Sequence, residues 1–334
     1  MSIEQSMAGK ADNLAGIAEG IVAAALAALV VAMLIADAFP EAWPAELLVS
    51  LSPQGTICGV TFAIIGVARR SAVIVLPAVA VAYLGWIGMS DRVASAPIGV
   101  GSSGDVSTLV WANVHREVAP FVRAIELALQ QDADVVAFGE APEIADVPVA
   151  ALKKLRSAFP FEAAPEPSGG VLLLAKTPFE NSGATRKNLK RSVRGATRTQ
   201  HGRIDIVAVH LPTPMSPGGQ VWRDHFMQET LAIARPDVPA LMVGDFNATP
   251  WSPQMRRWIA GGRFLRVGGK DSPTWFSRIP GLGLPIDHAF VAGGVRASVE
   301  IGPDIGSDHY PLIVRFKAPG TNGAFTQPIA GLRP

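Results

Sequence analysis

Three long apolar stretches without any Asp, Glu, Lys or Arg lie before residue 90, and they constrain the fold of this region most strongly. They cover residues 20–36, 47–68 and 71–89, with lengths of 17, 22 and 19 residues. A helix of about 20 apolar residues crosses the hydrocarbon core of a bilayer, which is about 30 Å thick. The pattern therefore predicts a membrane anchor over residues 1–90 with three transmembrane helices.

A cleaved signal peptide is an alternative for the first stretch. Ala36-Asp37-Ala38 resembles a small-residue cleavage site after an apolar segment. However, Lys10 is the only cation before the stretch, and two further apolar stretches follow at once. A retained membrane helix fits these features better.

The positive charges between the apolar stretches predict an orientation. Arg69 and Arg70 form the only cationic cluster in the short loops, whereas residues 37–46 hold three acids and no cation. Short loops rich in Lys and Arg stay in the cytoplasm. We therefore expect an integral protein of the plasma or inner membrane, in contact with the lipid bilayer, whose residues beyond 89 are extracytoplasmic.

The overall composition agrees with a membrane protein, because 49% of residues are hydrophobic and only 17% are charged. Beyond residue 90 the chain carries 26 Lys and Arg against 22 Asp and Glu. This excess is too small to predict nucleic-acid binding by itself. Cys58 is the only cysteine, so an intrachain disulfide is excluded.

After residue 90 the pattern changes to that of a mixed α and β domain. Residues 91–105 are rich in Ser, Gly, Ala and Pro and predict a linker. Apolar residues at helical spacing predict helices at 118–130, 219–234 and 252–260. Short apolar runs predict strands at 106–114, 135–138, 171–174, 204–209, 240–243, 286–291 and 312–316. Many strands with few helices favour two packed sheets flanked by helices.

Several of these runs end in polar side chains that suit the hydrolysis of a phosphate ester. This reaction needs a metal ion, a group that prepares water, and a group that stabilises the leaving oxygen. In Gly244-Asp245-Phe246-Asn247 a carboxylate and a carboxamide lie two residues apart, so both can point to one phosphate. An isolated segment of this kind would be an ordinary turn. Further polar groups at run ends favour the site: Asn113, Glu140, His210, Asp287, Asp308 and His309.

The segments at 244–247 and at 307–311, Ser-Asp-His-Tyr-Pro, resemble motifs of the endonuclease/exonuclease/phosphatase superfamily, the deoxyribonuclease-I-like hydrolases of phosphate esters. The resemblance covers residues 106–316. It implies an α+β fold, a four-layer α-β-β-α sandwich, preceded here by the three helices. We therefore place the catalytic domain at 106–317 and a flexible tail at 318–334.

The resemblance also implies a Mg²⁺ cofactor, with Mn²⁺ as an alternative. Glu140 matches the family glutamate that binds the metal, and Asn113 matches the asparagine that supports it. Asp308 is expected near the metal or its bound water. The chain departs from the family at Gly139, where Gln is usual, and this change affects the support of the metal site.

The catalytic roles follow from the same resemblance. Asp245 matches the residue that orients or deprotonates water, and Asn247 matches one that holds the phosphate. His309 matches the imidazole that contacts the phosphate, and Asp287 matches the carboxylate that fixes its tautomer. His210 matches a histidine that binds the phosphate or acts near the leaving group.

A basic segment at residues 181–203 contains seven Arg and Lys and no acid. Most charge runs are simply solvated. This segment is expected to border the active site in the resembling fold, so we predict Arg194 and Arg198 as substrate-binding residues. Lipid phosphates and nucleic-acid backbones both fit this charge.

Three functions remain open at this point. The first is a membrane-anchored, Mg²⁺-dependent phosphohydrolase that cleaves a mono- or diester, with a lipid-linked phosphate as the favoured substrate. Its layout resembles the membrane phosphohydrolases associated with glycopeptide (teicoplanin) resistance. The second is an extracytoplasmic endo- or exonuclease acting on DNA or RNA. The third is an inactive membrane adaptor that keeps the fold, for which Gly139 is the only support.

Overall fold

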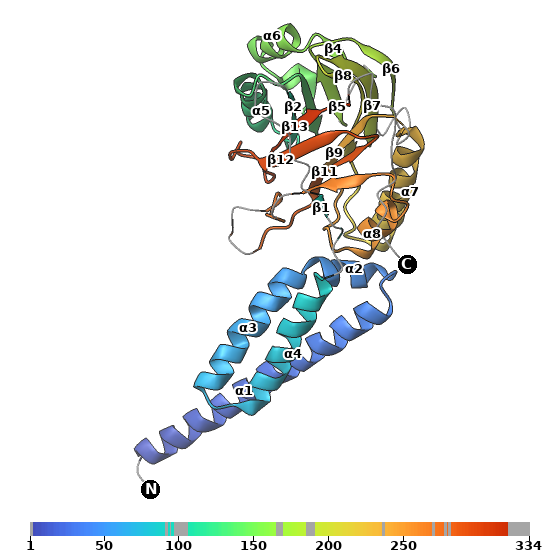
Figure 1. Cartoon of the computed structure of the whole chain (residues 1–334). Helices are drawn as coiled ribbons and strands as arrows, with labels where there is room; N and C mark the ends of the chain where they lie inside the picture. Colours follow the sequence, from blue (N-terminus) through green and yellow to red (C-terminus); the bar gives the residue numbers. More distant parts are fainter. Residues whose placement is uncertain are drawn as a thin grey trace. The chain divides into compact units, whose positions relative to one another are not determined.

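The structure is a computed structural model. It describes residues 3–90, 93, 95–96, 106–164, 170–184, 191–235, 238–268, 271–276, 279 and 282–319. The chain splits into two compact units, which Figure 1 shows. A helical unit comprises Met1–Arg92 and Trp251–Gln254, and a sandwich unit comprises Val93–Pro250 and Met255–Pro334.

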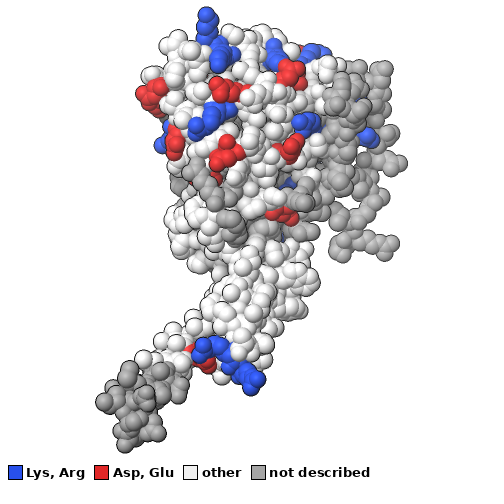
Figure 2. Space-filling model, turned by 90° about the vertical axis from the view of Figure 1, so that its left-hand side faces the viewer, with Lys and Arg blue, Asp and Glu red and all other residues white. Residues whose placement is uncertain are grey.

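The helical unit contains apolar helices that pack through small residues. Its helices are α1 (Ile3–Ala38), α2 (Trp43–Ser50), α3 (Ser52–Ala68) and α4 (Ala72–Gly88). A Cβ atom at Gly59 would lie 2.4 Å from the backbone nitrogen of Ala82, so α3 and α4 approach closely there. Such packing is typical of membrane helices. On the face that Figure 2 shows, the middle of this unit is without charged side chains.

The expectation of three transmembrane helices is only partly met. Within α1, the apolar segment Asn13–Ala38 has 26 residues and can cross a membrane by length and composition. The stretch at 47–68 is divided into α2 and α3, which are bent by 61° and count as one span at most. Pro53 in the first turn of α3 contributes to this division because it lacks an amide hydrogen. α4 has 17 residues, the short end of the spanning range.

The sandwich unit contains two β-sheets in its described residues (Figure 1). One sheet has the order β1 (Ser95–Ala96), β10 (Leu265–Val267), β11 (Asp287–Ala292), β9 (Ala240–Asp245), β8 (Gly202–His210), β7 (Ser192–Thr199) and β6 (Phe179–Ala184). The other has the order β12 (Arg296–Ile301), β13 (Leu312–Lys317), β2 (Ser107–Asn113), β3 (Val135–Gly139), β5 (Leu172–Ala175) and β4 (Phe161–Glu162). β2 is parallel to β3, and β8 is parallel to β9.

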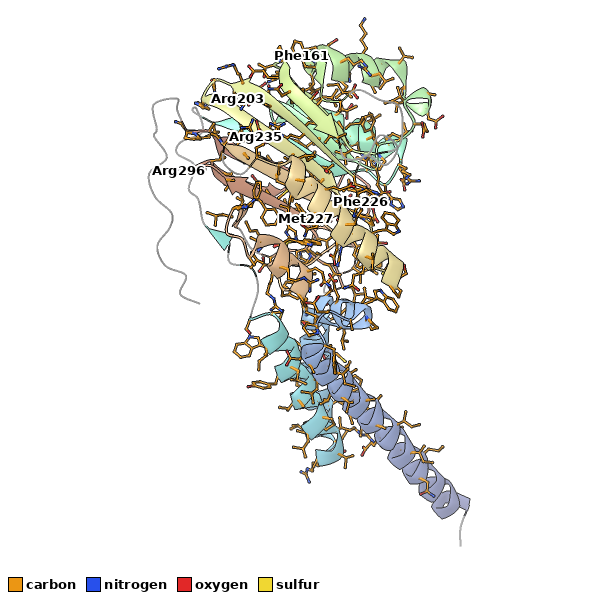
Figure 3. The ribbon with its side chains drawn as sticks, turned by 90° about the vertical axis from the view of Figure 1, so that its right-hand side faces the viewer. Phe161, Arg203, Phe226, Met227, Arg235 and Arg296 are labelled. Atoms are coloured by element: carbon orange, nitrogen blue, oxygen red, sulfur yellow. The ribbon has the colours of Figure 1, made fainter. Side chains whose placement is uncertain are left out.

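Helices cover the outer face of each sheet. α5 (Val118–Gln130) and α6 (Val149–Ala158), which follows the 3₁₀ helix η1 (Ile144–Asp146), pack on β2 and β3 through one apolar cluster. α7 (Pro217–Ile233) and α8 (Pro253–Ile259) pack on β8, β9 and β11 through another, to which α7 contributes Phe226 and Met227 (Figure 3). A third cluster fills the space between the sheets. The described residues therefore form the expected α-β-β-α layers.

Strand periodicity explains why both faces of these sheets are apolar. In β2, Leu109 and Trp111 lie in the cluster between the sheets, whereas Val110 and Ala112 lie in the cluster under α5 and α6. Neighbouring strand residues point to opposite faces. A strand buried on both faces therefore appears as a continuous apolar run, which is the pattern that predicted it.

The structure confirms some expected boundaries and changes others. The helix predicted at 118–130 has the same bounds as α5. Part of the expected linker at 91–105 forms β1, which pairs with β10, while most of the rest lies outside the described residues. Ala318, placed in the expected flexible tail, is buried in the core, and residues 320–334 lie outside the described residues. Several elements were not predicted from the sequence: β4, β6, β7, β10, β12 and α6.

Candidate active site

Strand ends from both sheets meet at one edge of the sandwich. Asn113 and Gly139 are register partners at the ends of parallel β2 and β3. His210 pairs with Asp245 at the ends of parallel β8 and β9, and Asp245 pairs with Asp287 at the start of antiparallel β11. The sheets join where the Asn113 side-chain amide donates to Asp245 Oδ2 at 3.2 Å. The topology thus gathers polar residues from segments far apart in the sequence.

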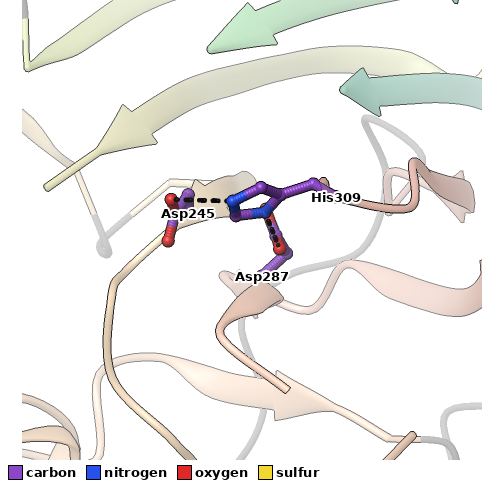
Figure 4. Close-up of side chains that lie close together, drawn as sticks. All are labelled: Asp245, Asp287 and His309. Atoms are coloured by element: carbon purple, nitrogen blue, oxygen red, sulfur yellow. Dashed lines mark hydrogen bonds and ion pairs between the residues drawn. The ribbon is translucent and has the colours of Figure 1, made fainter. Parts of the chain in front are cut away.

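His309 and Asp287 form a buried pair at this edge (Figure 4). Nδ1 of His309 lies 2.8 Å from Oδ2 of Asp287. The other oxygen of Asp287 accepts a 2.8 Å hydrogen bond from the indole nitrogen of Trp111. Burial disfavours the charged imidazole, but the negative charge of Asp287 and its hydrogen bond raise the pKa of His309 to about 9. His309 is therefore an imidazolium at neutral pH, with its ring orientation fixed.

Asp245 lies beside the free nitrogen of that ring. His309 Nε2 is 3.9 Å from Asp245 Oδ2, and Asp245 is 2% exposed. Burial and the nearby charge of Asp287 raise the pKa of Asp245 to about 6. A carboxylate with this pKa is ionised at neutral pH and is a better base than an ordinary aspartate.

Asn247 holds Asp245 in place. Its backbone N–H donates to Asp245 Oδ1 at 2.8 Å, and its side-chain amide donates to Asp245 Oδ2 at 3.2 Å and to the carbonyl of Leu211 at 2.8 Å. Asn247 has a φ of 48°, a left-handed conformation that is costly for most residues. The buried Arg223 donates to its carbonyl at 2.6 Å and so supports this turn.

Glu140 occupies the neighbouring corner. Its Oε1 lies 3.3 Å from His210 Nε2 and 3.4 Å from the side-chain nitrogen of Asn113. The pKa of Glu140 is lowered to about 2. The main cause is the hydrogen bond from His210; the charge of His210 and the Asn113 amide add to it, and burial opposes the shift. Glu140 has a φ of 47°, which directs this carboxylate out of the strand path.

Asp308 is brought close to Asn113 through its neighbour. The hydroxyl of Ser307 donates to the Asn113 carbonyl at 2.8 Å. Asp308 Oδ2 accepts from the indole nitrogen of Trp275 at 3.1 Å, and its Oδ1 lies 3.5 Å from His115 Nδ1. Asp308 is about one-third exposed, so its carboxylate is accessible at the rim.

Two groups of side chains at this edge could hold a metal ion. In the described residues, donor atoms of Asp245, Asp287 and His309 lie within 4.8 Å of one another. However, both oxygens of Asp287 and one nitrogen of His309 already have hydrogen-bond partners. Glu140, with Asn113 and Asp308, offers hard oxygen donors of the kind that Mg²⁺ prefers. Oxygens of this second set also have hydrogen-bond partners, so the two sets differ in the hardness of their donor atoms and not in whether those atoms are free.

The presence of glycine at position 139 is explained by its packing against Trp111. A Cβ atom there would lie 2.7 Å from Cη2 of the Trp111 indole, so a larger residue would displace the ring that holds Asp287. The glycine therefore accommodates Trp111. His288, adjacent to Asp287, points elsewhere: its Nε2 is 2.9 Å from the carbonyl of Ala248, and burial lowers its pKa to about 3.

The structure places Arg194 and Arg198, which were predicted to bind substrate, in ion pairs with acidic residues. Arg194 forms a close ion pair with the fully buried Asp205, and Arg198 lies 3.0 Å from Glu180. Arg198 lies opposite Arg203 in the β7–β8 register. Arg203 is seven residues from His210 in β8, which corresponds to about 23 Å along the strand. Figure 3 shows Arg203 at this far end. Three other cations of the segment, Arg186, Lys187 and Lys190, lie outside the described residues.

Sequence reasoning missed several residues at the edge. Trp111 lies two residues before Asn113 and therefore on the same strand face, a signal that could have identified it. His115 was assigned no role from the sequence, yet it lies beside Asp308. Arg116 Nε is 3.7 Å from Glu140 Oε2. Arg191 belongs to the basic segment, but only the folded hairpin distinguishes it from the other cations.

Comparisons with known proteins find a family model and similar folds. A family model described as "Endonuclease/Exonuclease/phosphatase family" matches residues 110–309. A structure of an endonuclease/exonuclease/phosphatase from Beutenbergia cavernae DSM 12333 has a TM-score of 0.53 and 19% identity over 65% of this chain and 72% of its own. A structure of a beta toxin mutant from Staphylococcus aureus, with bound magnesium ions, has a TM-score of 0.49 and 15% identity. The match covers 63% of this chain and 99% of the toxin chain. No curated protein matches the sequence. These similarities concern the fold.

Proposed function

Because the chain belongs to the endonuclease/exonuclease/phosphatase family, whose members hydrolyse phosphoester bonds, we propose that it is a membrane-anchored, metal-dependent phosphohydrolase. Its substrate is a phosphate ester on the extracytoplasmic side, with a lipid-linked phosphate favoured. The observation that carries this proposal is the buried arrangement in which Asp287 orients His309 and His309 faces Asp245.

The proposed chemistry uses the opposite charges of Asp245 and His309. Asp245 accepts a proton from water while the water oxygen forms a new bond to phosphorus. The imidazolium of His309 donates a hydrogen bond from Nε2 to a phosphate oxygen, where negative charge accumulates. The bond between phosphorus and the leaving oxygen breaks, and this oxygen takes a proton from bulk water. Trp111 and Asn247 hold the reacting groups in position.

Glu140, Asn113 and Asp308 would hold the divalent ion, Mg²⁺ or Mn²⁺. When bound, such an ion neutralises the negative oxygens of the phosphate and lowers the charge repulsion against the attacking water. Glu140 is well suited to this role because its low pKa keeps it ionised at all physiological pH values. His210, beside Glu140, would orient the carboxylate or contact the phosphate.

The proposed membrane anchor uses α1, α3 and α4. Only about 17% of the apolar window of α1 is buried, which is low for the core helix of a soluble protein. α3 and α4 each have 17 residues, or about 26 Å of helix. Arg69 and Arg70 lie between these two helices, and Arg69 is paired with Glu19 at 2.7 Å. Positive loops stay inside, so this arrangement favours an extracytoplasmic sandwich unit.

Two observations bear on the competing functions. The nuclease hypothesis relied on the basic segment, yet Arg194, Arg198 and Arg203 all have carboxylate partners. The adaptor hypothesis relied on Gly139, which is explained by the packing of Trp111. The resemblance of the sequence layout to glycopeptide resistance-associated membrane phosphohydrolases supports the proposal of lipid-borne substrates from the cell envelope.

A substrate screen tests the proposed activity. The full-length protein in detergent, with Mg²⁺, is assayed on a polyprenyl phosphate, a phospholipid and DNA in parallel, with Asp245→Asn as the inactive control. We expect Mg²⁺-dependent phosphate release from the lipid phosphate, with a weak dependence on salt. DNA cleavage that falls steeply with salt would instead indicate the nuclease. No turnover of any substrate would support the adaptor.

A topology experiment tests the anchor separately. A reporter enzyme that is active only outside the cytoplasm is fused after Lys317, and the fusion is compared with one placed after Arg70. We expect activity from the first fusion and none from the second. The reverse result would contradict the proposed orientation.

A further inference from the structure

Arg116 and Arg191 lie on the Glu140 side of the site, and the proposed mechanism leaves both without a task. Arg116 lies three residues after the end of β2. Its Nε is 3.7 Å from Glu140 Oε2, and its side chain is 70% exposed. Its backbone N–H donates to the Glu140 carbonyl at 2.8 Å. His115 and Arg116 have φ values of 51° and 57°. Consecutive left-handed residues are costly and often occur at functional sites.

Arg191 reaches the same corner from β7. Its backbone carbonyl accepts the N–H of His210 at 2.7 Å, which fixes its position next to the site. Its guanidinium lies 6.0 Å from the centre of the Phe226 ring. Burial lowers the pKa of Arg191, the charge of Glu140 raises it, and the charge of Arg116 lowers it. These interactions indicate that the two guanidinium groups share the neighbourhood of Glu140.

Arg191 differs from the other arginines of its segment. Within the described parts of the chain, its guanidinium has no carboxylate oxygen within 4 Å, whereas Arg194, Arg198 and Arg203 each have one. The charges of Glu140 and Asp245 therefore compensate this half-buried guanidinium for the loss of water only from a longer distance. Two neighbouring guanidinium groups also repel each other. An anion bound between them would relieve both costs.

We propose that Arg116 and Arg191 form a phosphate-binding pair that selects substrates with a terminal phosphate group, namely phosphomonoesters or the end of a diphosphate, over diesters. This inference rests on the proposed phosphohydrolase function. A terminal phosphate carries close to two negative charges at neutral pH, because its second pKa is about 6, whereas a diester carries one. Guanidinium groups bind such oxygens through charge-assisted hydrogen bonds. Hydrolysis would then break the bond from phosphorus to the leaving oxygen, form one to the oxygen of water, and release inorganic phosphate.

A comparison of two small substrates with one leaving group tests this selection. The kcat/KM of the full-length protein with Mg²⁺ is measured on p-nitrophenyl phosphate and on bis(p-nitrophenyl) phosphate. The variants are Arg116→Gln, Arg191→Gln, the double variant, and Arg203→Gln as a control with the same charge change at a paired arginine. Polyprenyl phosphate and polyprenyl diphosphate then distinguish the two sources of a terminal phosphate.

Each substitution in the pair is expected to lower kcat/KM for the monoester about tenfold, which corresponds to about 1.4 kcal/mol. The diester value should change less than about twofold, and Arg203→Gln should leave both unchanged. Equal losses on both substrates, or no loss on the monoester, would overturn the proposal. Arg116 is exposed, so its variant keeps the test valid if Arg191→Gln does not fold.

A binding measurement separates this proposal from the proposed function. Calorimetric titration of inorganic phosphate is carried out on Asp245→Asn with and without Arg191→Gln. We expect phosphate affinity to fall about tenfold when Arg191 is replaced. If the wild-type protein hydrolyses no ester but this loss is seen, the phosphohydrolase function fails and the anion pair stands. If the affinity is the same in both variants, the anion pair fails.

Discussion

The two ends of the β7–β8 hairpin are both rich in charge, but they use it in opposite ways. At the far end, Arg198 and Arg203 lie 3.0 and 3.1 Å from the two oxygens of Glu180. At the near end, Arg191 has no such partner in the described residues, and His210 lies between the acids Glu140 and Asp245. At the far end, both arginines therefore have a carboxylate partner within the chain. The near end gathers acids and cations that a metal ion and a phosphate would complete.

This contrast separates charge that supports the fold from charge that is available for function. Net charge along the sequence does not make that distinction, because the same basic segment supplies both ends. The burial of each charged side chain, together with its ion-pair partners, makes this distinction. Substitutions at the near end should therefore affect catalysis, and those at the far end should affect stability or nothing.

The largest effect is expected for the two groups that face the reacting phosphate. Asp245→Asn removes the base and His309→Ala removes the charged donor, so each should lower kcat on the order of 10³-fold. The measurement is Mg²⁺-dependent phosphate release, with circular dichroism to verify folding. Near wild-type turnover in either folded variant would remove the site from this edge of the sandwich.

The paired arginine in the middle of the hairpin, Arg194, should respond in stability instead. Arg194→Met leaves the fully buried Asp205 with Arg203, at 3.3 Å, as its remaining ion-pair partner among the described residues. The loss of the buried pair should cost about 2–3 kcal/mol of unfolding free energy, which urea denaturation measures. The kcat of the folded variant should stay within about twofold of wild type. A large fall in kcat without a loss of stability would show that Arg194 takes part in catalysis.

Trp111 should have an intermediate effect on turnover. Trp111→Phe removes the indole hydrogen bond to Asp287 and loosens the pair with His309, so we expect kcat to fall about tenfold with little change in KM. A double-mutant cycle with Asp287→Asn should be strongly non-additive, because both changes act on the same pair. Additive losses would mean that Trp111 acts only through packing.

The pH dependence should report the His309–Asp287 pair. His309 has a raised pKa of about 9, so the active imidazolium is present below that value and is lost as the pH rises through it. Activity should therefore decline near pH 9. Asp287→Asn removes the charge that raises this pKa, and the decline should move by more than one pH unit toward the ordinary histidine value of about 6.5. An unchanged alkaline limb would contradict the role of this pair.

The smallest effect is expected for Arg198. Arg198→Gln breaks an exposed ion pair with Glu180, and such pairs contribute about 0–1 kcal/mol. Both kcat/KM and the melting temperature should stay close to wild type. A tenfold loss of activity would restore Arg198 as a substrate-binding residue and would weaken the contrast between the two ends.

The sequence could predict those site residues that end strands. Asn113, Glu140, His210 and Asp245 follow apolar runs, and strands that run parallel deliver their last residues to a common edge. Two-sided burial also made the central strands visible as apolar runs. The roles assigned from the family remain predictions until variants are measured.

Other features depend on contacts between distant segments. The hydrogen bond from Trp111 to Asp287 joins residues 176 positions apart, and the partners of Arg194 and Arg198 follow from the hairpin register. The sequence shows seven similar cations in this segment, but only the fold distinguishes Arg191 from the paired ones. The division of the second apolar stretch near Leu51 likewise depends on local backbone geometry, which composition does not reveal.

Binding of Mn²⁺, as a paramagnetic substitute for Mg²⁺, tests the account most directly. The free Mn²⁺ signal in electron paramagnetic resonance is followed during titration of the wild-type protein, Glu140→Gln and the far-end variant Arg198→Gln. We predict saturable binding to the wild type and to Arg198→Gln, and at least a tenfold loss of affinity in Glu140→Gln, because that substitution removes a charged ligand. Equal Mn²⁺ affinity in all three proteins would contradict the assignment of the metal and the chemistry to this edge.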